Sequence, residues 1–295
     1  VRVGSLKGPT SIGLLNLMED NNNGSTTNKY SFTIEAQADI IAAMLTKGEL
    51  DIALIPANLA SVLFNKTEGK ITVIDINTLG VLYMLSADDS ISSVNDLAGK
   101  TIYLTGKGTT PDFVLRYILE GNGLSLDDVT LEYKSEATEI LGAMSNDPAA
   151  VALLPQPFAT VAMAKNDSLK VIFDMTKEWS LVNGDSDSIL VTGVTVVRND
   201  FLKDNEAAVV TFLADHEYSS KKAVMDIEGT AALTEKYGII DNAAIAKKAI
   251  PMCNIFYIDG EDMKNALRAY LEVLEQYDNS FIGGQLPSDD FFFVN

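Results

Sequence analysis

The chain has 295 residues, and 22 Lys and Arg against 41 Asp and Glu give it a formal net charge of −19. Because binding to nucleic acid or to an anionic membrane depends on clustered cations, and the sequence has no Lys- or Arg-rich run, neither partner is expected. Hydrophobic residues make up 47% of the chain, which is enough for a large core, and the length suits two domains or one two-lobed unit.

The chain begins in a strand pattern without an initiator Met, so any targeting segment is expected to have been removed. No stretch approaches the roughly 20 apolar residues of a membrane span. Short apolar runs alternate with segments of helical period, which predicts the α/β class with mainly parallel sheets flanked by helices. The expected strands are 1–5, 51–55, 71–76, 81–86, 101–105, 129–133, 150–154, 170–173 and 189–198. Helical periodicity is clearest at 40–45, 113–118 and 263–277.

The single cysteine and the single histidine limit the chemistry. Cys253 cannot form a disulfide within the chain, and these two residues are too few for a zinc site built from several Cys and His side chains. We expect Cys253 to be a buried apolar residue, and His216, in a helical stretch, to lie at the surface or to cap a helix. The sequence therefore predicts no metal ion and no cofactor.

Known nucleotide-binding and calcium-binding motifs are incomplete in this sequence. Residues 98–101 lack the first Gly of a Walker loop, and residues 106–111 begin like a dinucleotide fingerprint but have Pro111 in place of the third Gly. The acidic loop 183–188 lacks the Gly and Glu of an EF-hand loop, so a solvated turn is favoured over a calcium site. The Phe run 291–293 is expected to hold the C-terminus against a lobe.

Four loops share one arrangement, in which a hydrophobic strand ends in a small, polar, Pro-containing segment that opens a helix. They are residues 5–11, 55–61, 105–111 and 154–158. Loops at the carboxyl ends of strands border the ligand site of an open α/β sheet, and helix N-termini there carry partial positive charge. The loops are therefore either ordinary strand–helix turns or, taken together, the walls of a site for a small anion.

Five segments carry a resemblance to a known family. They are GSLKGPTSIG (4–13), GELDIALIPANLASVLFN (48–65), DLAGKTIYLTGKGTTPDFVLRYILEGNGL (96–124), ALLPQPFATVA (152–162) and VTGVTVVRNDFLKDN (191–205). Together they resemble the solute-binding proteins of ABC importers with the type 2 periplasmic-binding-protein fold, in the nitrate, sulfonate, taurine and thiamine-precursor group. The resemblance runs in order from Val1 to about Phe293, and it is more specific for the fold than for one solute.

The resemblance implies two α/β lobes that close by hinge motion on a solute in the cleft between them. Lobe one would be residues 1–87 with 190–295, lobe two would be residues 88–189, and the hinge crossings would lie near 84–90 and 188–193. By position, the family's pocket residues would be Ser5, Lys7, Gly8, Pro9, Thr10, Ser11, Pro56, Ala57, Asn58, Thr78, Thr192, Gly193 and Asn254 in lobe one, and Thr105, Gly108, Thr109, Thr110, Pro155 and Gln156 in lobe two.

The character of the solute follows from the few charges in these loops. Lys7 and Lys107 are the only cations of the first and third loops, which does not resemble the multiple-Arg clamp of a dicarboxylate or phosphate receptor. A solute with one anionic group, or a heterocycle, fits better. Lys7 would either contact the anion or be solvated, and Trp179 would either stack on a heterocycle or pack inside the protein.

The function that the resemblance implies is a monomeric, non-catalytic receptor that delivers a small solute to the permease of an ABC importer. Its location would be extracytoplasmic, as a periplasmic protein or as a lipoprotein anchored to the membrane. None of the implied pocket residues is His, Asp, Glu or Cys, which disfavours acid–base catalysis. Two alternatives remain open: an enzyme on the same fold, of the menaquinone- or pyrimidine-biosynthesis type, and a sensor domain.

Overall fold

The computed structural model describes residues 1–147, 149–184, 186 and 188–294, and the chain divides into two compact units. Unit 1 comprises Val1–Leu79 and Asp187–Asn295, and unit 2 comprises Gly80–Ser186. The sequence-based boundaries, 1–87 with 190–295 and 88–189, differ from this division mainly at the first crossing. The reason is that the strand Leu82–Ser86 pairs on both sides with strands of unit 2.

Unit 1 contains a six-stranded mixed sheet. Its strands are β1 (Arg2–Leu6), β2 (Ser31–Glu35), β3 (Ile52–Pro56), β4 (Ile71–Leu79), β10 (Val191–Arg198) and β11 (Ile255–Ile258), in the order β11-β4-β10-β3-β1-β2. The pairs β1–β2 and β1–β3 are parallel, whereas β10 lies antiparallel between β3 and β4. The sheet is therefore less parallel than predicted, because the returning strand β10 lies in its middle. The sequence did not predict β2 and β11, which form its two edges.

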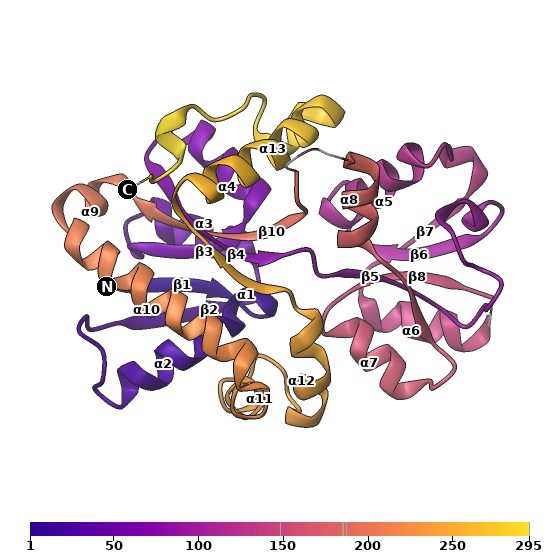
Figure 1. Ribbon diagram of the computed structural model, residues 1–295, viewed down its shortest axis with the longest axis horizontal. Helices are drawn as coiled ribbons and strands as arrows, with labels where there is room; N and C mark the ends of the chain where they lie inside the picture. Colours follow the sequence, from indigo (N-terminus) through magenta and orange to yellow (C-terminus); the bar gives the residue numbers. More distant parts are fainter. Residues whose placement is uncertain (148, 185, 187, 295) are drawn as a thin grey trace. The chain divides into compact units, whose positions relative to one another are not determined.

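Helices cover both faces of the unit 1 sheet (Figure 1). One face carries α3 (Ala38–Thr46), α4 (Ala57–Lys66) and α13 (Gly260–Asp278). The other carries α2 (Leu15–Asn22), α10 (Glu206–Met225), α11 (Ile227–Lys236) and α12 (Ala243–Ala249). The short helices α1 (Pro9–Ile12) and α9 (Asn199–Asp204) follow β1 and β10. Because both faces are covered, the central strands read as nearly continuous apolar runs.

Unit 2 contains a five-stranded sheet that, like the sheet of unit 1, has both parallel and antiparallel strand pairs. Its strands are β5 (Leu82–Ser86), β6 (Thr101–Thr105), β7 (Thr130–Lys134), β8 (Val151–Pro155) and β9 (Lys170–Asp174), in the order β7-β6-β8-β5-β9, with β5 antiparallel to β8 and β9. Helices α5 (Thr110–Gly121) and α8 (Met175–Asn183) cover one face (Figure 1). Helices α6 (Ala137–Asn146) and α7 (Phe158–Lys165) cover the other.

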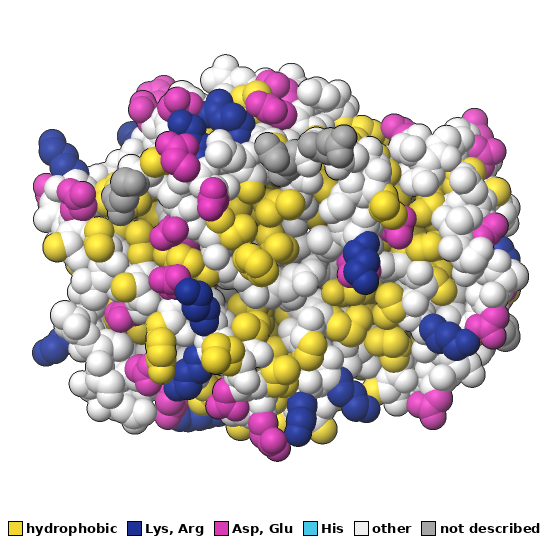
Figure 2. Space-filling model, in the orientation of Figure 1, with side chains coloured by type: hydrophobic (Ala, Val, Ile, Leu, Met, Phe, Trp, Pro, Cys, Tyr) yellow, Lys and Arg dark blue, Asp and Glu magenta, His cyan; other side chains and the backbone are white. Residues whose placement is uncertain are grey.

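The C-terminal aromatic run holds the end of the chain on unit 1, as predicted. Phe291 is fully buried, and the main-chain N–H of Phe293 donates to the Val73 carbonyl at 2.9 Å. On the face shown in Figure 2, acidic side chains are interspersed with Lys and Arg. Within the described ranges, no helix combines the length and the apolar composition that crossing a bilayer requires.

Candidate functional site

In unit 1, the predicted residues gather at one end of the six-stranded sheet. Strands β1, β3 and β4 end there, and the antiparallel strands β10 and β11 begin there: Gly193 pairs with Pro56 and with Thr78, and Ile255 also pairs with Thr78. Strand register or direct connection brings to this end Ser5, Lys7, Gly8, Pro9, Thr10, Ser11, Pro56, Ala57, Asn58, Thr78, Thr192, Gly193 and Asn254.

The first loop is held by its own serines. Gly8 has a φ of 143°, which favours glycine, and Pro9 begins α1. The Ser11 hydroxyl donates to the Leu6 carbonyl at 2.5 Å and lies 2.8 Å from the Ser5 hydroxyl, and both serines are fully buried. These side chains therefore fix the loop against β1. Since α1 has four residues, its N-terminus supplies little of the positive charge expected of an anion site.

Gly193 allows three elements to approach closely. A β-carbon at this position would lie 2.5 Å from Asn77 Oδ1 and 3.3 Å from both Thr10 Cγ2 and Thr78 Cβ. Any larger residue would push β10 away from β4 and from α1. The packing at the end of the sheet thus depends on a glycine at position 193.

A buried chain of hydrogen bonds, which the sequence did not predict, supports this end of the sheet. The Thr78 hydroxyl donates to Asn77 Oδ1 (2.9 Å), and Asn77 Nδ2 donates to the Thr195 hydroxyl (3.1 Å). Thr195 in turn donates to Asp75 Oδ1 (2.6 Å), and Asp75 Oδ2 lies 3.0 Å from His216 Nδ1. All five residues are buried. Asp75 and Asn77 interrupt the apolar run of β4, and this was the available signal in the sequence.

Lys7 is largely solvated. Its ammonium group lies 3.8 Å from Asp241 Oδ1, with the two side chains 49% and 90% exposed. An ion pair this exposed contributes little. The structure therefore favours the solvated alternative for Lys7.

In unit 2, the predicted residues also gather at one end of the sheet. Strand β6 ends at Thr105 and β8 at Pro155, and the antiparallel strand β5 begins beside Pro155, which pairs with Leu82. The loop from Thr105 to Thr110 leads into α5. Gln156 is buried, and its Oε1 accepts a hydrogen bond from the Thr160 hydroxyl at 2.8 Å. This bond orients the Gln156 amide at the start of α7.

The loop before α5 is anchored by Asp112. Its carboxylate accepts hydrogen bonds from the Gly108 main-chain N–H (2.8 Å), from Arg116 Nε (2.5 Å) and from the Tyr133 hydroxyl (2.8 Å). Burial alone would raise the pKa of Asp112, but these hydrogen bonds outweigh it and hold the pKa below its ordinary value. A carboxylate of the protein thus already occupies part of the loop in which an anion site was predicted.

Two side chains of the same loop are exposed to solvent. The Thr109 hydroxyl donates to the Gly106 carbonyl at 2.5 Å, so its proton is committed and its lone pairs remain as acceptors. Lys107 places its ammonium group 5.4 Å from the centre of the Tyr133 ring. The loop therefore offers both an acceptor and a cation to solvent.

Three residues outside the site differ in how well they were predicted. The prediction that His216 lies at the surface or caps a helix is wrong, because it is fully buried and faces Asp75. Trp179 packs against Tyr117 and Phe113, with ring centres 4.7 and 5.9 Å away, so packing replaces the heterocycle-stacking alternative. Cys253 is buried as expected, and burial raises the pKa of its thiol to about 12.

The predicted turn 183–188 lies partly outside the described residues, at 185 and 187.

Comparison with protein-family models gives a match over more than half of the chain. Residues 41–226 match the family described as NMT1/THI5 like. The chain belongs to the NMT1/THI5-like family. No curated protein matches this NMT1/THI5-like chain.

Solved structures share the fold over nearly the whole length of this NMT1/THI5-like chain. An ABC transporter protein from Parabacteroides distasonis is 28% identical, with a TM-score of 0.81, covering 99% of this chain and 98% of that one. The periplasmic aliphatic sulphonate binding protein SsuA from Escherichia coli is 14% identical, with a TM-score of 0.76 and coverages of 99% and 91%. The Candida albicans CA3427 gene product is 14% identical, with a TM-score of 0.62 and coverages of 99% and 92%. Its description as a generic periplasmic binding protein structural fold applies to this chain as well.

Proposed function

We propose that this protein is a solute-binding receptor of an ABC importer, with the strand-end loops of each unit as its candidate solute contacts. The observation that carries the proposal is the gathering, in each unit, of Gly-, Pro- and Thr-containing loops at the carboxyl ends of parallel strands, where α/β sheets bind ligands. The likeness to an ABC transporter protein and to a sulphonate binding protein supports this role. The implied partners are the solute and an importer permease.

The solute that fits best carries both a hydrogen-bond donor and an anionic group. The Thr109 hydroxyl offers lone pairs, because its proton is bound by the Gly106 carbonyl, and Lys107 offers a positive charge. An aminoalkanesulfonate meets both requirements, and a heterocycle with N–H groups meets the first. Nitrate has no donor, so it would leave the Thr109 acceptor unused.

A receptor is favoured over an enzyme by the chemistry of the pocket loops. Acid–base catalysis needs a titratable group within reach of the substrate. The proposed contact residues include no His, Asp, Glu or Cys, their one titratable side chain, Lys7, is largely solvated, and His216 is fully buried. An enzyme of menaquinone or pyrimidine biosynthesis would require the substrate to reach other groups. A sensor domain could use the same pocket and would instead require a signalling domain fused or adjacent to it.

The proposed receptor role implies where the protein acts, and the proposal also includes its oligomeric state. We propose that the protein acts outside the cytoplasmic membrane, as a periplasmic protein or as a lipoprotein, where it meets the solute before the permease does. We also propose that it acts as a monomer.

The proposal is tested by a thermal-shift screen against alkanesulfonates, taurine, nitrate, bicarbonate, hydroxymethylpyrimidine and riboflavin-like heterocycles. A solute that binds the native state must raise the melting temperature. We expect one class to do so, with micromolar or tighter affinity, which corresponds to roughly 8 kcal/mol. A ligand that co-purifies with the protein is checked by mass spectrometry after denaturation. Absence of any shift and of any bound ligand would contradict the receptor role for these solutes.

The contact residues are tested with the solute that the screen identifies. Replacing Thr109 and Thr110 by Val removes two hydroxyls from the loop before α5, and we expect affinity to fall about thirtyfold, since each net hydrogen bond contributes roughly 1 kcal/mol. The matched control is the double variant Thr130→Val and Thr138→Val at exposed positions of the same unit, which should bind as the natural chain does. Equal affinity of the two double variants would remove this loop from the site.

A further inference from the structure

A second cavity lies in unit 1, at the opposite end of the sheet from the proposed solute loops. It has a volume of about 410 Å³, within the range of small-molecule sites, and lies between the C-terminal ends of α3 and α4, the start of β4 and the junction of β10 with α9. Ile71 and Arg198, which both line it, pair across β4 and β10. Since β4 runs from Ile71 to Leu79, the cavity is separated from the other end of the strand by roughly 26 Å at about 3.3 Å per residue.

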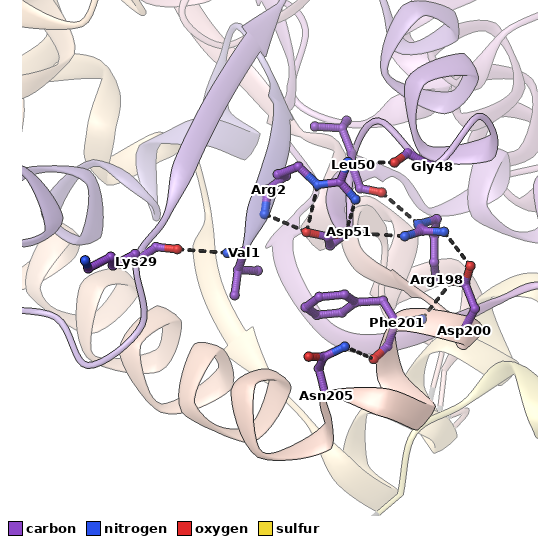
Figure 3. Close-up of polar contacts among 10 residues, drawn as sticks. All are labelled: Val1, Arg2, Lys29, Gly48, Leu50, Asp51, Arg198, Asp200, Phe201 and Asn205. Atoms are coloured by element: carbon purple, nitrogen blue, oxygen red, sulfur yellow. Dashed lines mark hydrogen bonds and ion pairs between the residues drawn. The ribbon is translucent and has the colours of Figure 1, made fainter.

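Arg198 is held in a fixed position beside this cavity (Figure 3). Its Nε donates to the Leu50 carbonyl (2.9 Å), one terminal nitrogen donates to Asp200 (2.6 Å) and the other to Asp51 (3.3 Å). A β-carbon at Gly48, which has a φ of +74°, would lie 3.3 Å from Nη1, so the approach of this turn requires glycine. Within the described part of the chain, three of the five N–H donors of this guanidinium group are used, which leaves one on each terminal nitrogen.

The carboxylates near the cavity are already neutralised. Asp200 binds Arg198 through Oδ2 and the main-chain N–H of Phe201 through Oδ1 (2.7 Å). The buried Asp51 is shared between Arg198 and Arg2 (Figure 3). Lys70 lines the cavity and makes no ion pair with any residue of the described ranges. Arg2, Arg198 and Lys70 carry three positive charges against the two negative charges of Asp51 and Asp200. These five residues therefore keep one net positive charge in a strongly acidic protein.

The remaining walls offer an apolar surface with few free donors. Ile71 is almost fully buried, so most of this apolar surface comes from the methyl groups and hydrocarbon stems of the polar lining residues. The hydroxyls of Thr46 and Thr67 donate to the carbonyls of Ala42 and Leu63 in their own helices, both at 2.7 Å, so their protons are not available to a ligand. An apolar cavity with a cation at its edge matches a ligand with a hydrocarbon body and one negative charge.

We propose that this cavity binds a small, singly charged organic anion, such as an aromatic carboxylate or sulfonate, with the anionic group at Lys70 and Arg198 and the ring against the methyl groups and hydrocarbon stems of the other lining residues. The site is separate from the proposed solute site and does not depend on that function. It would be a second ligand site on the same unit.

The test uses two fluorescent probes of similar shape. 8-Anilinonaphthalene-1-sulfonate carries the negative charge, and N-phenyl-1-naphthylamine lacks it. We expect Lys70→Gln to weaken binding of the anilinonaphthalene sulfonate about fivefold, as for an exposed ion pair, and to leave the neutral probe unaffected. Lys66→Gln is the matched control, because Lys66 is an exposed lysine nearby on the last turn of α4 and should leave binding of both probes unchanged.

Other outcomes would overturn the proposal. Equal weakening by Lys66→Gln and Lys70→Gln would mean that the sulfonate responds to general surface charge. The sulfonate probe would instead lie at the proposed solute loops if its binding were lost in the Thr109→Val and Thr110→Val double variant or in Asn58→Ala. In that case Lys70→Gln would bind the probe as the natural chain does. If the screened solute fails to bind while the Lys70 effect persists, the receptor role fails and the second site stands.

Discussion

Asp75 accepts a hydrogen bond at each carboxylate oxygen, and this fixes the direction of the whole buried chain. Because a carboxylate has no proton to give, Thr195 must donate to it, Asn77 must then donate to Thr195, and the Asn77 oxygen is turned toward Thr78. On the other side, the His216 ring must present Nδ1–H to Asp75. A single buried charge thereby sets the orientation of an amide, two hydroxyls and an imidazole.

This direction gives a prediction for the protonation of His216. We expect Nδ1 to be a protonated nitrogen of the ring, because the bare lone pair of Nδ1 would otherwise face the Asp75 carboxylate. The measurement is a long-range proton–nitrogen correlation spectrum of nitrogen-15-labelled protein without a tag. It needs no assignment, since the chain contains one histidine. A folded protein whose histidine is the neutral Nε2–H tautomer would contradict the hydrogen-bond chain.

At the residue scale, the sequence predicted which loops gather but not what their side chains do. Ser5 and Ser11 were expected to line a pocket, yet they are buried and bond the loop to itself. His216 was misplaced because helical periodicity does not show that a partner, Asp75, lies 141 positions away. Contacts between distant positions depend on the packing of the sheet, which local pattern does not contain.

At the scale of elements, the buried central strands were predictable and the edge strands were not. β3 and β8 are continuous apolar runs, since helices cover both of their faces. β2 reads SFTIE and is half-exposed, and β11 has four residues, so neither forms a strong apolar run. The sequence also gave no sign that β5 and β10 would run antiparallel within their sheets.

The loop before α5 gives a prediction at this scale, because Asp112 joins it to the helix and to β7. We expect Asp112→Asn to lower the free energy of unfolding at pH 7 by about 1–3 kcal/mol, since hydrogen bonds to a charged, buried acceptor are lost or weakened. The pKa of Asp112 is lower in the folded state, so its stabilisation is present above the ordinary value of 3.8 and is lost as the pH falls through the folded value. The difference between the two proteins should therefore shrink below about pH 4.

The measurement is urea unfolding at pH 7 and at pH 3, followed by circular dichroism. The control is Asp127→Asn, which removes the same charge at an exposed position of unit 2 and should change stability by less than about 0.5 kcal/mol. A pH-independent difference for Asp112→Asn would show that the residue acts through shape and not through its charge.

At the scale of the whole molecule, the discontinuity of unit 1 came from the family resemblance and not from sequence pattern. Unit 2 is one continuous segment with a complete five-stranded sheet, whereas unit 1 needs β10 to return between β3 and β4. Apolar periodicity identifies strands without their order. The expected boundary follows Leu82–Ser86 for the same reason, since this strand looks like any other buried strand until its partners are known.

The register of β4 and β10 makes the independence of the two units testable. Leu79 pairs with Val191 in antiparallel strands, so replacing residues 80–190 with an Asn-Gly turn would convert β4 and β10 into a hairpin. We expect this shortened unit 1, and separately residues 80–186 alone, each to fold and to unfold cooperatively on heating, because each keeps its own sheet, covering helices and core. Circular dichroism and proton–nitrogen correlation spectra provide the measurement. If either piece lacks a cooperative transition while the full chain has one, that unit draws essential stability from the rest of the chain.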